Sequence, residues 1–377
     1  MSNSNLSKDT QCVHTGGIED SAIGGVVSPI YPSTAYNYVD ADKYMYPRYF
    51  NIPNHTAVEQ KLAAIESTEN AVLFSSGMAA TMTVLLTFLQ KGDHVFLQSD
   101  LYGGTNDAVS VEMKKFGIEY TFAPALKDSL IKNIQPNTKV IFIESPSNPL
   151  LKVTDIREVV ALAKEKQIIT VMDNTFASPI NQNPHNLGID IVIHSGTKYL
   201  GGHSDICCGI ACMSDELTSR VRETGVHYGG NLDAQAAWLL ERSLKTLHLR
   251  VSRQNENALA IAKFLSNHPK VENVYYPGLE NDPYHQLASN QMSGFGGMLA
   301  FEVAGNPDMM VKRLKLIKPA MSLGGVESTI GSPSQTSHAR IGAQQREELG
   351  IKDNLLRMSV GVENATDLIA DLEKALE

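Results

Sequence analysis

Lys198 follows a short apolar run, residues 191–193, that is typical of a buried strand, and it precedes a Gly-Gly turn. Two small hydroxyl side chains, Ser195 and Thr197, come just before it. Hydroxyl donors beside an amine suit a bound phosphate, and a lysine in an apolar pocket loses proton affinity and can attack a carbonyl group. The competing interpretation is a solvated loop lysine, because most lysines lie in water.

Asp173 ends a second apolar run, residues 168–172, upstream of Lys198. A carboxylate at the end of a buried strand needs a positively charged or donating partner. A helix N-cap or a metal ion would satisfy that need, and so would the protonated pyridine nitrogen of pyridoxal phosphate, which makes the ring an electron sink. Asp173 and Lys198 together favour the pyridoxal phosphate interpretation.

The run Ser195 to Asp205, SGTKYLGGHSD, closely resembles the S-A-T-K-Y-x-G-G-H-S-D signature of the cysteine/methionine-metabolism (transsulfuration) family of pyridoxal phosphate enzymes. That family includes cystathionine gamma-synthases, cystathionine lyases and methionine gamma-lyases. Further motifs follow in family order from Tyr46 to Glu363, so the resemblance covers nearly the whole chain. It implies fold type I, an aspartate-aminotransferase-like α/β fold in which a large domain with a mainly parallel sheet adjoins a smaller C-terminal α/β domain.

The resemblance also implies roles for particular residues. Lys198 would bind the cofactor covalently and move protons, Asp173 would keep the pyridine nitrogen protonated, and Tyr102 would stack on the ring and handle a proton. The remaining cofactor contacts that it implies are Gly77, Met78, Asn148, Thr175, Ser195 and Thr197. The contacts that it implies for the substrate carboxylate are Asn148, Ser322 and Arg357. From the residues alone, an arginine in an apolar strand is equally consistent with a structural acid as its partner.

Tyr46 and Arg48 form a Tyr-x-Arg motif that, in the resembling family, reaches the cofactor phosphate of the neighbouring subunit. An arginine fork and a phenol suit a phosphate, although a surface Tyr/Arg pair has the same sequence. Residues 1–50 have weak periodicity and scattered Gly and Pro, so we expect an arm that packs on another subunit. The resemblance therefore implies a homodimer with shared active sites, and a homotetramer as in the family. The family usually continues N-P-T, whereas residues 51–54 read NIPN.

Apolar strands that alternate with amphipathic helices predict a mainly parallel sheet covered on both faces. The predicted strands are 71–74, 94–98, 118–123, 139–144 and 168–172, and the predicted helices include 56–65 with Thr56 as its N-cap, 79–89 and 155–166. Ligands bind at the carboxyl ends of such strands, where we expect Tyr102, Asn148 and Asp173. The turn from Ser75 to Met78 precedes a helix, so it offers free N–H groups to a phosphate. Residues 51–250 are expected to form the cofactor-binding domain, and residues 251–377 the C-terminal domain.

The chain has 377 residues and a formal net charge of -9, which argues against nucleic acid and anionic membranes as partners. Its polar start lacks the apolar core of a signal peptide, so we expect a cytoplasmic protein. Four cysteines are too few for a disulfide framework in a chain of this length. The run ICCGIACM predicts a buried strand of small residues rather than a metal site.

These observations predict a pyridoxal phosphate-dependent carbon–sulfur lyase that acts on methionine, homocysteine or cystathionine by gamma- or beta-elimination. A gamma-replacement synthase, of the cystathionine gamma-synthase or O-acylhomoserine sulfhydrylase type, would use the same residues. A catalytically idle pyridoxal phosphate-binding protein is disfavoured because Lys198, Asp173, Tyr102 and Arg357 are all present. A nicotinamide enzyme is disfavoured because no G-x-G-x-x-G follows the first strand.

Two methionines bear on the choice of substrate. Family members that handle cystathionine often carry glutamate just before the Tyr-x-Arg motif and just before S-L-G-G, and here Met45 and Met321 stand at those positions. A thioether cannot pair with a cation, so the pocket is expected to favour an apolar or short gamma-substituent. The alternative is that both methionines only fill space.

Overall fold

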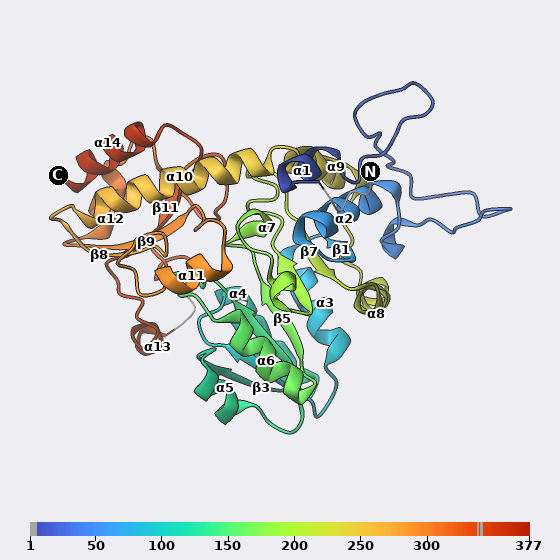
Figure 1. Cartoon of the computed structure of the whole chain (residues 1–377), viewed down its shortest axis with the longest axis horizontal. Helices are drawn as coiled ribbons and strands as arrows, with labels where there is room; N and C mark the ends of the chain where they lie inside the picture. The colour runs from blue at the N-terminus through green and yellow to red at the C-terminus, as the bar shows by residue number, and fades with distance from the viewer. Residues whose placement is uncertain (1–5, 338, 340–341) are drawn as a thin grey trace.

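The computed structural model of the chain describes residues 6–337, 339 and 342–377. Within these residues, two β-sheets are covered by helices, and the chain has the α/β architecture that the sequence predicts (Figure 1). The described strands of the larger sheet lie in the order β1-β7-β6-β5-β4-β2-β3, and those of the smaller sheet in the order β10-β11-β12-β9-β8.

The strands of the larger sheet are β1 (Asn70–Phe74), β2 (His94–Gln98), β3 (Glu119–Ala123), β4 (Thr138–Glu144), β5 (Ile169–Asp173), β6 (Ile191–His194) and β7 (Gly209–Met213). Those of the smaller sheet are β8 (Val271–Tyr275), β9 (Met298–Val303), β10 (Lys318–Pro319), β11 (Thr329–Gly331) and β12 (Leu355–Ser359). The larger sheet is mainly parallel, because only β7 runs antiparallel to its described neighbours.

The helices of the first half are α1 (Lys8–His14), α2 (Pro53–Glu66), α3 (Gly77–Phe88), α4 (Gly103–Ala108), α5 (Lys127–Asn133), α6 (Ile156–Lys166) and α7 (Ser178–Asn181). Those of the second half are α8 (Asp215–Tyr228), α9 (Ala234–Leu244), α10 (Leu247–Ser266), α11 (His285–Gln291), α12 (Pro307–Arg313), α13 (Ala343–Glu348) and α14 (Ala365–Leu376). Two short 3-10 helices are η2 (Pro47–Tyr49) and η4 (Pro184–Leu187), and η3 (Val109–Met113) is a short π-helix.

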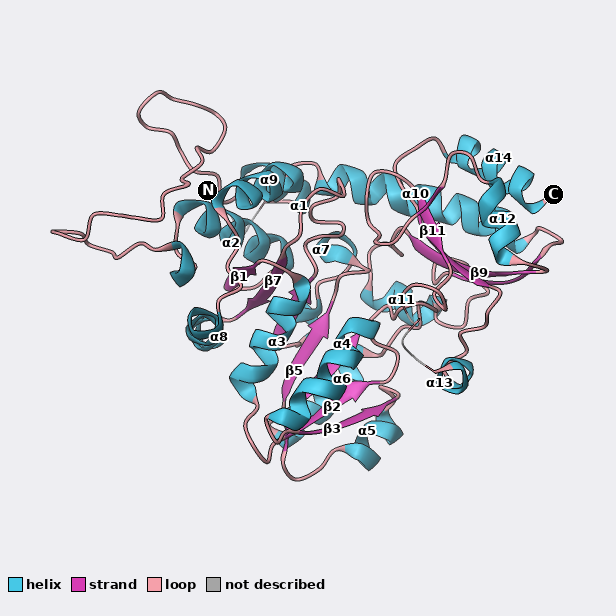
Figure 2. Cartoon of the chain, turned by 180° about the vertical axis from the view of Figure 1, so that it is seen from behind, coloured by secondary structure: helices cyan, strands magenta, loops and turns pink. Residues whose placement is uncertain are grey.

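Both faces of the larger sheet are buried, because successive residues of its strands join different hydrophobic clusters. In β1, for example, Leu73 belongs to the cluster that includes side chains of α2, α6 and α9, whereas Phe74 belongs to the cluster that includes side chains of α3 and α8. Alternate side chains of a strand point to opposite faces. The larger sheet is therefore a central layer between two groups of helices, as Figure 2 shows from behind.

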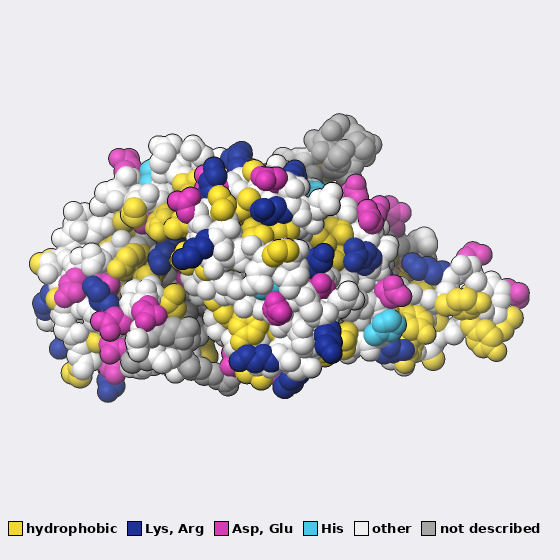
Figure 3. All heavy atoms as spheres, turned by 90° about the horizontal axis from the view of Figure 1, so that it is seen from below, with side chains coloured by type: hydrophobic (Ala, Val, Ile, Leu, Met, Phe, Trp, Pro, Cys, Tyr) yellow, Lys and Arg dark blue, Asp and Glu magenta, His cyan; other side chains and the backbone are white. Residues whose placement is uncertain are grey.

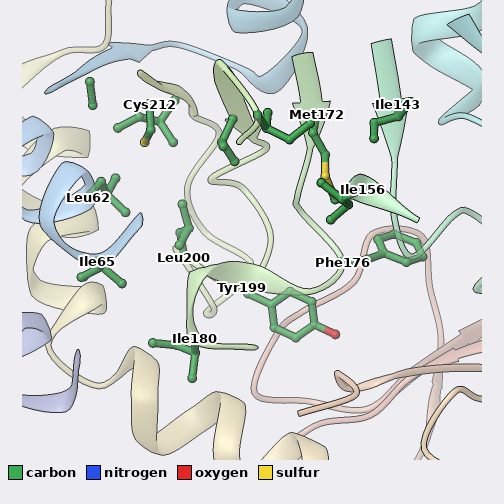
Figure 4. Packing of buried hydrophobic residues seen from close by; sticks show 14 of the residues in the cluster. Leu62, Ile65, Ile143, Ile156, Met172, Phe176, Ile180, Tyr199, Leu200 and Cys212 are labelled. Atoms are coloured by element: carbon green, nitrogen blue, oxygen red, sulfur yellow. The ribbon is translucent and has the colours of Figure 1, made fainter. Parts of the chain in front are cut away.

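The first of these clusters also anchors the segment that carries Lys198. Tyr199 and Leu200 follow the lysine directly, and both are buried in the same cluster as Met172 of β5 and Cys212 of β7 (Figure 4). Burial of two adjacent large side chains fixes the backbone on the carboxyl side of Lys198.

The long helix α10 runs from the larger sheet to the smaller one (Figure 1). Its residues Ala258, Ile261 and Leu265 pack with residues of β9, β12 and α14 in a third hydrophobic cluster. The domain boundary predicted at residue 250 falls inside this helix and stays a prediction. None of the described helices is long and apolar enough to cross a membrane.

Two local predictions are wrong. Thr56 is not an N-cap: α2 begins at Pro53 with Ile52 at the N-cap position, because proline is preorganised for the first helical turn. The predicted strand of small residues begins only at Gly209, so Cys207 lies outside β7 and is exposed.

Candidate active site

A cavity of about 540 Å³ lies at the carboxyl ends of β4, β5 and β6. The turns after these strands meet the starts of α3 and α4 and residues from the smaller sheet, including β12. The predicted site residues that line this cavity are Gly77, Met78, Tyr102, Asn148, Asp173, Thr175, Ser195, Thr197, Lys198, Met321, Ser322 and Arg357. The sheet therefore gathers side chains that lie far apart in the sequence. A larger, more open groove of about 1030 Å³ lies beside α2, and none of these residues lines it.

Asp173 ends β5, between the ends of β4 and β6. Its carboxyl Oδ1 accepts a hydrogen bond from the Thr175 backbone N–H at 2.9 Å. Burial raises the pKa of Asp173, and the hydrogen bonds from Thr175 oppose that shift. The Thr175 hydroxyl accepts a hydrogen bond from the Ser195 backbone N–H at 2.8 Å, which ties the turns after two neighbouring strands together. A cation placed against Asp173 would relieve the cost of burying this carboxylate.

Lys198 extends into the cavity and donates a hydrogen bond from Nζ to the Ser322 hydroxyl at 2.7 Å. Burial lowers the pKa of Lys198, and the positive charge of Arg357 lowers it further. A lowered pKa leaves more of the amine unprotonated near neutral pH, which is the form that attacks a carbonyl group. Ser322 has a φ of 79°, so the backbone is in an unusual conformation at the residue that contacts the lysine.

The start of α3 forms a concave site suited to a phosphate. Ser76 caps this helix, and its hydroxyl accepts a hydrogen bond from the Ala79 backbone N–H at 3.0 Å. A Cβ atom at Gly77 would lie only 2.9 Å from the Cβ of Ser195, so a side chain there would fill the space. The Thr197 hydroxyl pairs with the backbone C=O and N–H of Cys208 at 3.2 and 3.1 Å. A helix N-terminus that begins with a glycine, beside a serine hydroxyl, favours an anion.

Arg357 lies on β12, and its guanidinium donates a hydrogen bond to the side-chain oxygen of Asn148 at 2.7 Å. Burial lowers the pKa of Arg357 to about 10, and the nearby carboxyl of Glu144 opposes that shift. The guanidinium is therefore still charged near neutral pH. An arginine and an amide at one wall of the cavity suit a carboxylate ligand.

Met45, Tyr46 and Arg48 do not belong to the described lining of this cavity. Arg48 lies beside α8 instead, where its guanidinium donates a hydrogen bond to the Val226 carbonyl at 2.5 Å. The same guanidinium lies 5.5 Å from the ring centroid of Tyr49. Within one chain, the Tyr-x-Arg motif is therefore separate from Lys198.

Sequence reasoning missed Glu144 and Cys207, which both line the cavity. Glu144 ends β4 in register with Asp173 at the end of β5. The pattern that pointed to Asp173, an acid at the end of an apolar strand, therefore also applied to Glu144. Cys207 was assigned to a strand that starts two residues later.

Lys198, Asp173 and the start of α3 line one cavity, and this combination of an amine, a buried carboxyl group and a helix N-terminus fits pyridoxal phosphate by charge and by room. The fold and the site thus define the class, a fold-type-I pyridoxal phosphate enzyme. The chain belongs to the Cys/Met metabolism PLP-dependent enzyme family, whose sequence model matches residues 9–377.

Relatives with assigned functions span the full length of the chain. It is 44% identical to a cystathionine gamma-lyase of Bacillus subtilis over 99% of this chain and 100% of that protein. It is 42% identical to the cystathionine beta-lyase MetC of the same organism over 100% of this chain and 98% of that protein. The solved structure of a cystathionine gamma-lyase from Lactobacillus plantarum, complexed with L-serine, matches with a TM-score of 0.95 and 38% identity, over 98% of each chain.

Proposed function

We propose that this protein is a pyridoxal phosphate-dependent carbon–sulfur lyase that acts on cystathionine, methionine or homocysteine by gamma- or beta-elimination. The observation that carries the proposal is the single cavity onto which Lys198, Asp173 and Arg357 all open. A covalent anchor, a partner for a ring cation and a partner for an amino-acid carboxylate are what such a reaction requires. The names of the full-length relatives support the same class of reaction.

Each residue has a specific part in this proposal. The cofactor supplies an electron sink when it is bound. Asp173 holds the pyridine nitrogen protonated, and the start of α3 with Ser195, Thr197, Gly77 and Met78 binds the phosphate. Tyr102 would stack on the ring, and Thr175 would sit beside it.

The proposed substrate contacts are side chains that line the same cavity as Lys198. Arg357 and Asn148 orient the substrate carboxylate, so that the α carbon lies near the lysine amine. Lys198 Nζ, with its lowered pKa, takes a proton from that carbon and returns one to a neighbouring carbon. The Ser322 hydroxyl positions the amine for both transfers.

We also propose that the site is completed by a second copy of the chain. Residues 1–50 would form an arm that brings Tyr46 and Arg48 to the neighbour's phosphate, in a homodimer or a homotetramer. Residues 51–250 would bind the cofactor, residues 251–377 would form the C-terminal domain, and the protein would act in the cytoplasm. The separation of Arg48 from the cavity of its own chain supports the shared site.

Met321 shapes the proposed preference among sulfur amino acids. It lines the cavity and is 70% exposed, so it lies where the far end of a substrate would pass. Met45 does not line the cavity of its own chain, so its influence would be on the neighbour's site. An apolar thioether favours an apolar or short gamma-substituent over a distal ammonium group.

A substrate panel tests the proposal. Cystathionine, methionine, homocysteine, cysteine and acylated homoserines, each with and without added cysteine, are scored for keto acid and for new thioether. Keto acid without thioether supports a lyase, whereas thioether formation from an acylated homoserine identifies a gamma-replacement synthase and overturns the proposed reaction. Comparing Met321→Glu with the neutral control Met321→Gln tests specificity, because only the acid can pair with a distal ammonium. We expect kcat/KM for cystathionine relative to methionine to rise about tenfold in Met321→Glu alone.

A further inference from the structure

The proposed reaction does not use one acidic group in the cavity wall, Glu144. Its side chain is 4% exposed, and it lies at the end of β4 next to Asp173 of β5. A buried carboxyl group is costly unless other groups satisfy it, so its partners indicate what it does.

The first partner is the turn that carries Tyr102. Glu144 Oε2 accepts a hydrogen bond from the Tyr102 backbone N–H at 2.8 Å. Tyr102 is the residue before α4, and its ring stands at the cavity with 45% of the residue exposed. The backbone contact with Glu144 therefore holds the turn from which this half-exposed ring projects.

The backbone of Glu144 is held by the side chain of Gln98. The side-chain amide of Gln98 donates to the Glu144 carbonyl at 2.9 Å and accepts from the Glu144 backbone N–H at 3.2 Å. These two bonds join the ends of β2 and β4. The carboxyl group therefore projects from a fixed backbone toward the cavity.

The second set of partners lies on the side that we assign to the substrate carboxylate. Glu144 lines the same cavity as Arg357 and Asn148, and its carboxyl group opposes the lowering of the Arg357 pKa by burial. Arg357 and Asn148 are joined to each other at 2.7 Å. The carboxyl group that holds the Tyr102 turn thus borders the same cavity as this pair.

Glu144 does not need a negative charge to hold the Tyr102 turn. Burial and the neighbouring acids Asp173 and Asp100 raise its pKa, whereas the hydrogen bonds from Tyr102 and Asn148 lower it. A carbonyl-type oxygen is enough to accept the bond from Tyr102, and this oxygen persists in a protonated acid or an amide.

We propose that Glu144 is a positioning residue for the substrate: its carboxyl group holds the Tyr102 turn in place beside the Arg357–Asn148 pair that would bind the substrate carboxylate. It acts through Tyr102 and does not contact the substrate. This inference rests on the proposed function, because it uses the carboxylate-binding role given there to Arg357 and Asn148.

The test compares Glu144→Ala with Glu144→Gln in the full chain loaded with pyridoxal phosphate. Glutamine keeps the accepting oxygen and alanine removes it. Asp100→Asn is the matched control, because Asp100 also acts on Glu144 but accepts its own bonds from Gln98 and Ser147. Binding of L-alanine, which has a carboxylate but no gamma-substituent, is followed by the change in visible absorbance. Melting temperature and cofactor content are measured on every variant.

We expect Glu144→Ala to weaken L-alanine binding, and to raise KM for the substrate, about tenfold or more, with kcat within about threefold. Glu144→Gln and Asp100→Asn should stay within about threefold of the wild type in both measurements. Wild-type binding by a folded, loaded Glu144→Ala variant would overturn the inference. So would a Glu144→Gln variant as weak as Glu144→Ala, or a loss confined to kcat. L-alanine binding separates this result from a failure of the proposed function, which shows only in turnover of the substrate panel.

Discussion

The cavity at the larger sheet and the N-terminal segment, residues 6–50, are built in opposite ways. The cavity draws its residues from many elements, and the strands beneath it are buried on both faces. The N-terminal segment has one short helix, α1, and then a long stretch without regular structure up to Pro47. In that stretch Val26 is 96% exposed, Ile23 84% and Tyr38 72%.

The exposed apolar residues are where we expect the chain to contact a neighbouring copy. Hydrophobic side chains gather on the part of the molecule that projects at the right-hand end of Figure 3. Apolar patches of this kind on a protein surface usually mark contacts with other proteins. One chain brings Lys198, Asp173 and Arg357 to one cavity, whereas the proposed arm would supply the remaining phosphate contacts from its neighbour.

The largest expected effect comes from the cavity side. Lys198→Ala should lower turnover of the preferred substrate by at least roughly 10³-fold, because one amine both anchors the cofactor and moves protons. The phosphate contacts at the start of α3 do not depend on this side chain, so the variant should still bind free cofactor. Steady-state kinetics and absorbance after dialysis measure the two properties. Turnover near the wild-type rate would remove Lys198 from the mechanism.

The second prediction tests whether the arm acts on a neighbour. Arg48→Ala should lower activity roughly 10- to 100-fold by loss of a charge-assisted phosphate contact. Mixing it with Lys198→Ala in equal amounts should restore about a quarter of wild-type activity, because half of the dimers are then mixed and each has one intact site.

The control for this experiment is the double variant Arg48→Ala/Lys198→Ala mixed with Lys198→Ala, which creates no intact site. Mass spectrometry must first show that subunits have exchanged. If exchange is complete and activity does not return, each chain builds its site alone.

The third prediction concerns a contact between the N-terminal segment and helix α2. Lys61 of α2 is fully buried, and its Nζ donates to the Cys12 carbonyl at the end of α1 at 2.9 Å. Burial lowers the pKa of Lys61 to about 8. Between pH 8 and the ordinary lysine pKa near 10.5, the unfolded chain binds this proton and the folded chain does not, so the free energy of unfolding rises with pH.

Relative to Lys61→Met, the wild type should therefore gain roughly 2 to 3 kcal/mol of stability as pH rises from 8 to 10.5. Urea unfolding at both pH values measures the difference, and comparing the two proteins cancels the contribution of other lysines. Equal pH dependence in both proteins would mean that Lys61 titrates normally in the folded state.

The sequence alone predicted well which residues lie at the cavity, for a physical reason. Parallel strands end at the same edge of a sheet, so Asp173 and Asn148 could be brought together from chain order and periodicity before any coordinates. Thr56 was misassigned because a proline three residues earlier already starts the helix. Glu144 was passed over because its importance depends on a contact with Tyr102, 42 positions away, which no local pattern encodes.

The N-terminal side could not be placed in this way. Tyr46 and Arg48 were predicted to reach a neighbouring subunit, and their own chain shows only that they lie away from its cavity. The partner of an exposed arm is not specified by the periodicity of the arm itself. That prediction remains for the mixing experiment.

The most direct test of the account is chemical reduction of the purified protein loaded with pyridoxal phosphate. The loaded protein should be yellow, the visible band should vanish on treatment with borohydride, and peptide mapping should then find the cofactor attached to the peptide that contains Lys198. Attachment at a different lysine, or no attachment in a protein that holds the cofactor, would contradict the central claim that Lys198 is the residue around which this site is built.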